Sequence, residues 1–181
     1  MRRDMISASF IENTQNHDSN LPVIDICKVN KLGAPEYSVL VKKNDIPTVK
    51  LQVYLFDETD CFKSIICNDE TVVIGCGEKV HFYSIGSNLV KTIKLNDYFG
   101  YLYSDKGIEE NNFKHHLYIA SGLKLYKYKA DGAKVWESDY LAVDGVILGN
   151  IDSGVIVCRG EQDPPGGWVE YKLDESTGKI I

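Results

Sequence analysis

The hydrophobic and polar positions of this chain alternate in short segments, a pattern typical of β-strands. In residues 49–55 the apolar side chains of Val49, Leu51 and Val53 occupy every second position. Successive side chains of a strand point to opposite faces, so this segment is predicted to be a strand with one buried face. Further segments rich in Val, Ile, Tyr and Phe follow, separated by turn residues. A capped amphipathic helix is considered only for residues 1–16.

One strand-like segment recurs along the chain. Positions 72–77 read Val-Val-Ile-Gly-Cys-Gly, positions 117–122 read Leu-Tyr-Ile-Ala-Ser-Gly, and positions 155–160 form a looser third copy, Val-Ile-Val-Cys-Arg-Gly. The copies align Gly77, Gly122 and Gly160, which are predicted to occupy the same turn. Repeats of about 20–50 residues are typical of stacked or radially arranged β-units.

Each unit is expected to contain four short strands joined by turns such as Asp-Gly and Ser-Gly, because glycine accepts positive φ angles. Residues 1–20 are predicted to form a polar N-terminal arm, loosely ordered or with a short strand. Residues 21–181 are predicted to form a single β domain. Its blade-like repeats are expected at about 21–56, 60–95, 98–141 and 145–181.

Residues 123–136 resemble a blade of the PQQ-like and WD40-like β-propeller families. In such blades an aromatic residue ends the third strand, an Asp-Gly turn follows, and an aromatic residue opens the outer strand; here these are Tyr128, Asp131-Gly132 and Trp136. The first copy has Lys91 in place of Trp136, and an insertion at 162–167 interrupts the third. Neither the WD40 signature nor a quinoprotein ligand set is present. The resemblance implies a propeller-like architecture over roughly residues 60–181 and no functional residues.

The expected fold is therefore all-β, with antiparallel four-stranded blade-like meanders forming a small or partial β-propeller. Four blades are the lower limit for closing such a ring. An open form would expose strand edges, which pair readily with other chains, so it predicts a homo-oligomer or a partner that adds a strand. A β-sandwich or an irregular barrel is the alternative architecture.

Charge and composition narrow the classes of partner. The chain has 181 residues and a net charge of −6. Nucleic acid recognition depends on clustered Lys and Arg, so an acidic chain without a basic run predicts no nucleic acid partner. Its acidity fits solubility or a basic protein partner. No apolar run approaches the roughly 20 residues that span a bilayer, and polar residues follow the N-terminus too soon for a signal peptide. A cytoplasmic protein without membrane contact is expected.

The residues that could carry chemistry form no recognisable set. The five cysteines are odd in number and lack Cys-x-x-Cys spacing, so they are expected to be structural thiols. His115 and His116 are adjacent, and adjacent strand residues point to opposite faces, which argues against a shared metal ion. We therefore expect no catalytic residues, no metal and no cofactor.

The insertion between Glu161 and Trp168 is the most distinctive local feature. Two prolines restrict φ, and the two glycines that follow permit a tight reversal. Tryptophan is frequent at interface hot spots, and the acidic residues can meet Arg or Lys of a partner. The predicted partner-binding residues are Glu161, Asp163, Pro164, Pro165 and Trp168. The alternative is a rigid hairpin whose Trp168 packs into the blade.

These features favour a non-catalytic protein-interaction module with a protein partner of basic charge. Its narrower form is a bacterial immunity- or inhibitor-type protein that caps a basic toxin. The alternative is a small-ligand-binding protein or an enzyme with a site in a propeller-type channel or cleft. An exposed Trp168 on a flat acidic face would favour the interaction module. A polar pocket with convergent carboxylates would favour the alternative.

Overall fold

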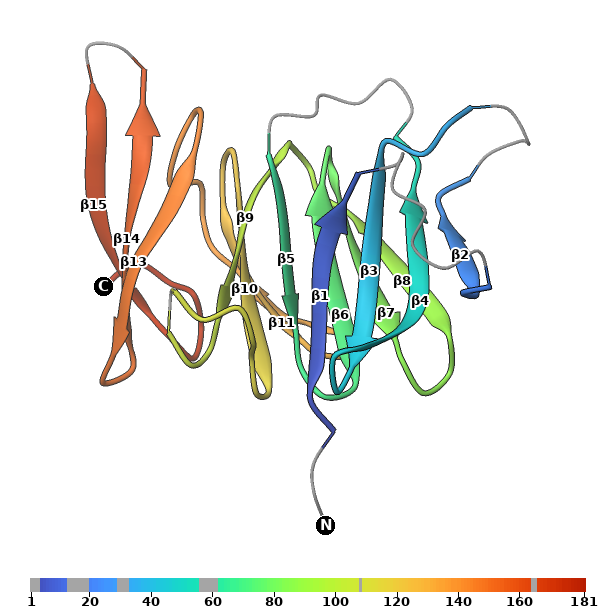
Figure 1. Ribbon diagram of the computed structural model, residues 1–181. Helices are drawn as coiled ribbons and strands as arrows, with labels where there is room; N and C mark the ends of the chain where they lie inside the picture. The colour runs from blue at the N-terminus through green and yellow to red at the C-terminus, as the bar shows by residue number, and fades with distance from the viewer. Residues whose placement is uncertain (1–3, 13–19, 29–32, 56–61, 108, 164–165) are drawn as a thin grey trace.

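The computed structural model of the chain describes residues 4–12, 20–28, 33–55, 62–107, 109–163 and 166–181. These residues form fifteen strands in four sheets and no helix (Figure 1). The all-β class expected from the sequence is confirmed. None of the segments described here forms a helix long and apolar enough to cross a membrane.

The strands are grouped in chain order. The first sheet contains β1 (Ile6–Ile11), β2 (Val23–Ile26), β3 (Tyr37–Lys43) and β4 (Ile46–Val53). The second contains β5 (Lys63–Cys67), β6 (Thr71–Cys76), β7 (Lys79–Ser84) and β8 (Leu89–Lys94). The third contains β9 (Phe99–Ser104), β10 (His116–Ser121), β11 (Leu125–Lys129) and β12 (Lys134–Glu137). The fourth contains β13 (Val146–Asp152), β14 (Val155–Gln162) and β15 (Gly167–Asp174).

The second and third sheets are four-stranded antiparallel meanders, as the repeat predicts. The first sheet has the order β1-β3-β4-β2, and β2 pairs with β4 in parallel. Its edge strand β1 comes from the segment expected to be a polar arm or short strand. The fourth sheet has three strands, and Ile180 adds only a single bridge to Leu173. The regular unit is therefore found in the middle of the chain and is altered at both ends.

The sheets lie face to face and follow one another across the molecule (Figure 1). Their first strands form a contact series in which β1 touches β5, β5 touches β9 and β9 touches β13. Each sheet is an open row of strands, and the strands described do not close into a barrel. The radial arrangement of blades and the closure of a propeller ring both stay predictions.

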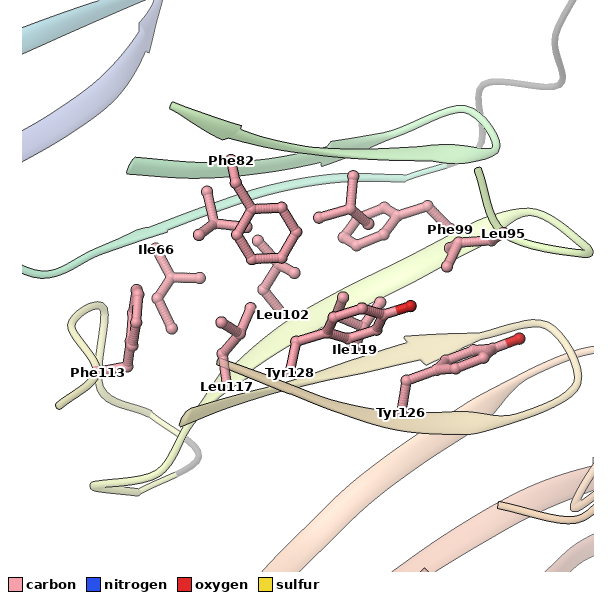
Figure 2. Packing of buried hydrophobic residues seen from close by; sticks show 12 residues of the cluster. Ile66, Phe82, Leu95, Phe99, Leu102, Phe113, Leu117, Ile119, Tyr126 and Tyr128 are labelled. Carbon is pink, nitrogen blue, oxygen red and sulfur yellow. The ribbon is translucent and has the colours of Figure 1, made fainter. Parts of the chain in front are cut away.

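Three apolar cores separate the four sheets, and strand alternation explains which residues enter each core. On β6, Val72 and Ile74 pack toward the first sheet, whereas Val73 packs toward the third. On β10, Leu117 packs toward the second sheet and Tyr118 toward the fourth. Figure 2 shows the side chains between the second and third sheets. Because the two middle sheets are covered on both faces, their inner strands β6 and β10 have nearly continuous apolar sequences.

The aligned glycines serve different purposes. Gly77 occupies the β6–β7 turn with φ of 58°, and Gly122 follows β10 at the corresponding turn. Gly160 lies inside β14, so its prediction as a turn residue was wrong. A Cβ at Gly160 would lie 1.9 Å from the carbonyl oxygen of Leu141. Glycine is therefore needed here because the main chain of Leu141 packs directly against β14. The insertion after Gly160 lengthens the β14–β15 hairpin and does not split the sheet.

A polar cluster fastens the fourth sheet to the third. The Glu175 carboxylate accepts hydrogen bonds from Lys127 Nζ at 2.9 Å and from the Tyr118 hydroxyl at 2.8 Å. Trp136 Nε1 donates to the Glu175 carbonyl at 2.9 Å. The bonds from Lys127 and Tyr118 hold the pKa of Glu175 below its ordinary value, against the opposing effect of burial. Lys127 is only 8% exposed, so this ion pair is largely shielded from water.

Glu175→Gln is expected to destabilise the protein at neutral pH, because Lys127 then lacks a counter-charge. The expected loss is about 2 kcal/mol, or roughly 4–8 °C in melting temperature, for a hydrogen bond to a charged group in a chain of this size. A carboxylate with a lowered pKa contributes stability above its unfolded pKa and loses it as the pH falls through the folded value. The difference from wild type should therefore vanish at low pH in thermal unfolding. Glu170→Gln on exposed β15 is the control, and a pH-independent loss would contradict the ion-pair explanation.

Gly75→Ala is expected to disrupt the core between the second and third sheets. A Cβ at Gly75 would lie 2.1 Å from Phe99 Cε2, so the ring must move. Overpacking of this kind costs about 1–3 kcal/mol. Urea unfolding should show that Phe99→Leu recovers part of this loss in the double variant. Gly86→Ala, where no atom lies within 4 Å of the added carbon, is the matched control. Strictly additive effects of Gly75→Ala and Phe99→Leu would refute this packing contact.

Candidate functional site

A pocket of about 360 Å³ lies between the third and fourth sheets, at the end of the molecule that carries the β14–β15 hairpin. Five of its twelve described lining residues are aromatic. The rings belong to Phe62, Tyr98, Tyr101, Tyr103 and Trp168. The carboxylates of Asp144 and Glu161 also line it, and no described Lys, Arg, His or Cys does. The pocket therefore combines aromatic surface with negative charge.

Strand β9 presents two tyrosines to the pocket. Tyr101 and Tyr103 are two positions apart, and their ring centroids lie 5.0 Å apart with an interplanar angle of 54°. Leu102 between them belongs to the core on the opposite face of the third sheet. Tyr103 is buried against the fourth sheet, whereas Tyr101 is 47% exposed. The period of two thus gives one anchored ring and one accessible ring.

Tyr98 is held by contacts on three sides. Its hydroxyl donates to the Asp144 carbonyl at 2.6 Å and lies 3.0 Å from Asp144 Oδ1. Its ring stacks on Phe62, with centroids 6.1 Å apart and an interplanar angle of 30°. The other side of the ring faces Gly122, where a Cβ would approach within 2.5 Å. Tyr98 therefore fixes the position of the Asp144 segment relative to the third sheet.

Glu161 and Trp168 are opposite each other in the β14–β15 pair. A Cβ placed on Gly145 would lie 3.7 Å from Trp168 Cη2, 3.8 Å from the Tyr98 hydroxyl and 3.9 Å from Glu161 Oε2. These three groups therefore border the same space. The Glu161 N–H donates a hydrogen bond to the Gly145 carbonyl at 2.9 Å, and the Glu161 carbonyl accepts one from the Val143 N–H at 2.8 Å. The main chain under Glu161 is thus fixed on both sides.

The Glu161 carboxylate makes no hydrogen bond or ion pair within the described part of the chain, although the residue is half-buried. Arg159, two positions earlier on β14, is exposed and forms no ion pair with it there. Trp168 beside it is 45% exposed. An unpaired acid next to an accessible indole is an arrangement that suits a cation from outside the chain.

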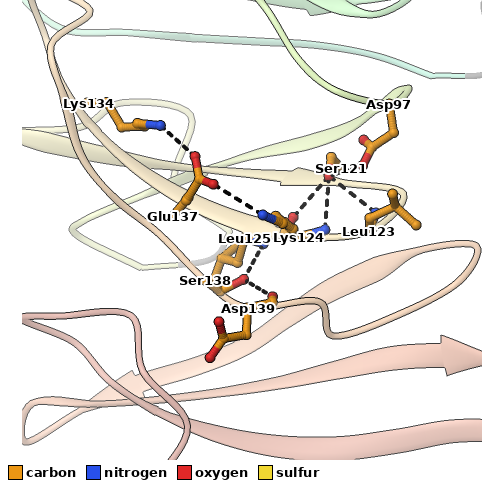
Figure 3. A network of polar contacts seen from close by, with 9 residues as sticks. All are labelled: Asp97, Ser121, Leu123, Lys124, Leu125, Lys134, Glu137, Ser138 and Asp139. Atoms are coloured by element: carbon orange, nitrogen blue, oxygen red, sulfur yellow. Dashed lines mark hydrogen bonds and ion pairs between the residues drawn. The ribbon is translucent and has the colours of Figure 1, made fainter.

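A polar network that includes Ser121 and Asp97 adjoins the pocket (Figure 3). Ser121, which lines the pocket, donates from Oγ to Asp97 at 3.1 Å, and Oγ accepts the N–H of Lys124 at 3.0 Å. The N–H of Gly122 also donates to Asp97, at 3.2 Å. Asp97 immediately precedes Tyr98, so these bonds fix the tyrosine to the β10–β11 turn.

Burial raises the pKa of Asp97, and the hydrogen bonds from Ser121 and Gly122 only partly oppose this. A raised folded pKa favours folding at low pH, and that contribution is lost as the pH rises through the folded value. Asn carries no charge at this position. The melting temperature of Asp97→Asn should therefore rise relative to that of wild type as the pH increases from 4 to 7. Thermal unfolding across this range, with exposed Asp139→Asn as control, measures the trend. A difference that becomes more negative toward pH 7 would rule out this explanation.

Two of the five residues predicted from the sequence to bind a partner line the pocket. The structure brings Glu161 and Trp168 together there, and Trp168 is not packed into the blade. Asp163 lies exposed at the hairpin turn, where its carbonyl accepts the Gly166 N–H, and it does not line the pocket. Pro164 and Pro165 lie outside the described residues.

Most of the aromatic wall was missed by sequence reasoning. The spacing of Tyr101 and Tyr103 within a predicted strand was the one available signal, since it places both on one face. Phe62 and Asp144 come from a strand start and a connecting segment, and no local pattern links them to the hairpin. Only the stacking of the sheets brings them together.

Other chemistry-bearing residues of the described segments lie away from this pocket. A hollow of about 430 Å³ at the other end of β5 is lined by acidic and basic side chains together, including Asp69, Lys106 and His115. No cluster of three or more His, Cys, Asp or Glu suited to a metal occurs among the described positions. The cysteines seen there are free thiols, and burial raises the pKa of Cys158 to about 11.

No protein-family model matches the chain, and a search of curated proteins found no similar sequence. Among solved structures, the computationally designed Ika4 protein is similar with a TM-score of 0.50 and 10% identity, over 70% of this chain and 72% of that one. Hydrazine synthase of Kuenenia stuttgartiensis is similar with a TM-score of 0.53 and 14% identity, over 94% of this chain and 51% of that one. This chain thus spans about half the length of that hydrazine synthase chain. At these identities the likeness concerns the fold alone.

Proposed function

We propose that this protein is a non-catalytic interaction module that binds a basic protein partner at the end of the fold carrying the β14–β15 hairpin. The observation that carries the proposal is that accessible Trp168 lies beside the Glu161 carboxylate, which has no partner among the described residues, at a pocket that no described basic side chain lines. Both groups stand on adjacent strands with a fixed main chain. A partner can therefore meet them without rearranging the fold.

The aromatic groups supply apolar contact area. Trp168, Tyr101 and Phe62 are 45%, 47% and 54% exposed around one pocket. Clustered exposed apolar surface marks interaction sites more often than scattered residues do. Tryptophan and tyrosine are also the residues most often found at interface hot spots.

Charge indicates the kind of partner. Asp144 and Glu161 line the pocket, Asp163 lies at the adjacent hairpin turn, and the chain carries a net charge of −6. A negative surface accelerates encounter with positive partners and disfavours acidic ones. A basic partner protein therefore fits this surface. The narrower hypothesis of an immunity- or inhibitor-type protein rests on size and charge and remains a hypothesis.

The lining residues argue for recognition without catalysis. Among the described lining residues Ser121 is the one serine, no threonine or cysteine occurs, and no His or Lys is present to activate its hydroxyl. Its Oγ is already engaged by Asp97 and the β10–β11 turn. The second candidate function, a small-ligand-binding protein or an enzyme, is favoured by the pocket volume and by the two carboxylates that line the pocket, Asp144 and Glu161.

The proposal is tested by affinity capture from the source cells, identification of the captured protein and measurement of its dissociation constant. We expect a basic partner whose binding weakens at high salt. Trp168→Ala should weaken binding about 30-fold, corresponding to a hot-spot loss of about 2 kcal/mol. Exposed Leu89→Ala on β8 and Glu110→Gln in the β9–β10 loop are matched controls. An acidic partner, or a basic partner that is indifferent to Trp168→Ala and Glu161→Gln, would sink the proposal.

A further inference from the structure

We infer that the pocket between β9, β13 and the β14–β15 hairpin receives an arginine side chain of the basic partner. This inference rests on the proposed function and specifies the group that the site recognises. The guanidinium would lie against the indole of Trp168 and the ring of Tyr101 and would pair with the Glu161 carboxylate. Three features of the pocket carry it: its rings, its unpaired acid and its size.

The rings suit a planar cation. A guanidinium is flat, stacks on aromatic faces and is less strongly hydrated than an ammonium group. Cation–π attraction is strongest for tryptophan, and both Trp168 and Tyr101 are about half-exposed at the pocket. In a pocket that remains open to water, a strongly hydrated lysine ammonium would gain less from the same contacts. Arginine is therefore favoured over lysine.

The Glu161 carboxylate suits the guanidinium group of arginine, whose N–H donors form a fork. Glu161 Oε2 and Trp168 Cη2 both lie within 4 Å of the Cβ position of Gly145, so carboxylate and indole border one space. Arginine binds a carboxylate through two parallel N–H···O bonds, which adds direction to the charge attraction. Asp144 supplies a second negative charge, and its carboxylate accepts a hydrogen bond from the Tyr98 hydroxyl.

The same combination occurs elsewhere in this protein, where the chain completes it with its own cation. Lys127 lies 5.4 Å from the centre of the Tyr118 ring and 2.9 Å from Glu175. On the same sheet, Lys124 lies 4.6 Å from the centre of the Tyr140 ring and 3.1 Å from Glu137. The pocket repeats this pairing of ring and carboxylate with more rings, and no described basic side chain lines it.

The dimensions fit a long side chain. About 360 Å³ is many times the roughly 30 Å³ that one water occupies and falls in the range of about 300–1,000 Å³ found for ligand pockets. The pocket opens beside the hairpin, so an extended segment of a partner could lie across its mouth with one side chain inserted.

The test is a titration of the ¹⁵N-labelled full chain with N-acetyl-L-arginine methylamide, followed through the two indole N–H signals. The signal of Trp168, assigned with Trp168→Phe, should shift and saturate at millimolar ligand. The signal of Trp136, whose indole is bonded to the Glu175 carbonyl, should not move. N-acetyl-L-lysine methylamide should bind at least about fivefold more weakly, and Glu161→Gln should weaken arginine binding about tenfold, the loss of one charge-assisted pair. Glu170→Gln is the control for charge on β15.

Absence of a Trp168 shift at tens of millimolar arginine probe would overturn the inference. Equal or tighter binding of the lysine probe would overturn it too, as would unchanged binding by Glu161→Gln. The probe requires no partner, so these failures leave the proposed function standing. Conversely, a working arginine pocket in a protein whose captured partner ignores Trp168→Ala would remove the proposed function, and the pocket would then belong to a small guanidinium ligand.

Discussion

Burial of both faces of the second and third sheets is the constraint on which the rest of the structure depends. Val72 and Val73 point to opposite sides of one strand, and so do Leu117 and Tyr118, yet all four are fully buried. Leaving such side chains in water would forfeit about 1.5–3 kcal/mol each. Each middle sheet therefore needs a neighbour on both faces. Four sheets in chain order satisfy this requirement, because the second and third each lie between two others.

The first and fourth sheets lie at the ends of the stack, where burial of both faces is not required, and the repeat is altered in both. A terminal sheet needs only one apolar face. In the fourth sheet Cys158 and Leu173 are buried, whereas Arg159 and Glu170 on the same strands are exposed. The first sheet likewise departs from the meander of the middle sheets, because its strand order is β1-β3-β4-β2 and β2 pairs with β4 in parallel. The pocket forms where the third sheet, still tightly packed, meets the less constrained hairpin of the fourth.

The sequence predicted the features that depend on local spacing. The alternation over 49–55 and the repeated runs at 72–74 and 117–119 all correspond to buried strands. Gly160 was misplaced because aligning the copies assumes equal strand lengths, and β14 extends to Gln162. The interrupted repeat drew attention to Glu161 and Trp168, which the structure places opposite each other on β14 and β15. Their neighbours Phe62 and Asp144 could not be found, since side-by-side placement of strand ends depends on how whole sheets stack.

The unpaired acid connects this packing to recognition. Between the third and fourth sheets, the Tyr118 ring and the Glu175 carboxylate enclose Lys127, and the completed ion pair fastens the two sheets together. The Glu161 carboxylate has no such partner among the described residues. The chain places its own lysine between a ring and a carboxylate at Lys28, Lys124 and Lys127, but not beside Glu161, so it departs from its own pattern at this point. Departures of this kind are expected at binding sites, where stability is given up for an interaction that the partner completes. Under the proposed function, the cation missing beside Glu161 and Trp168 is the partner's contribution.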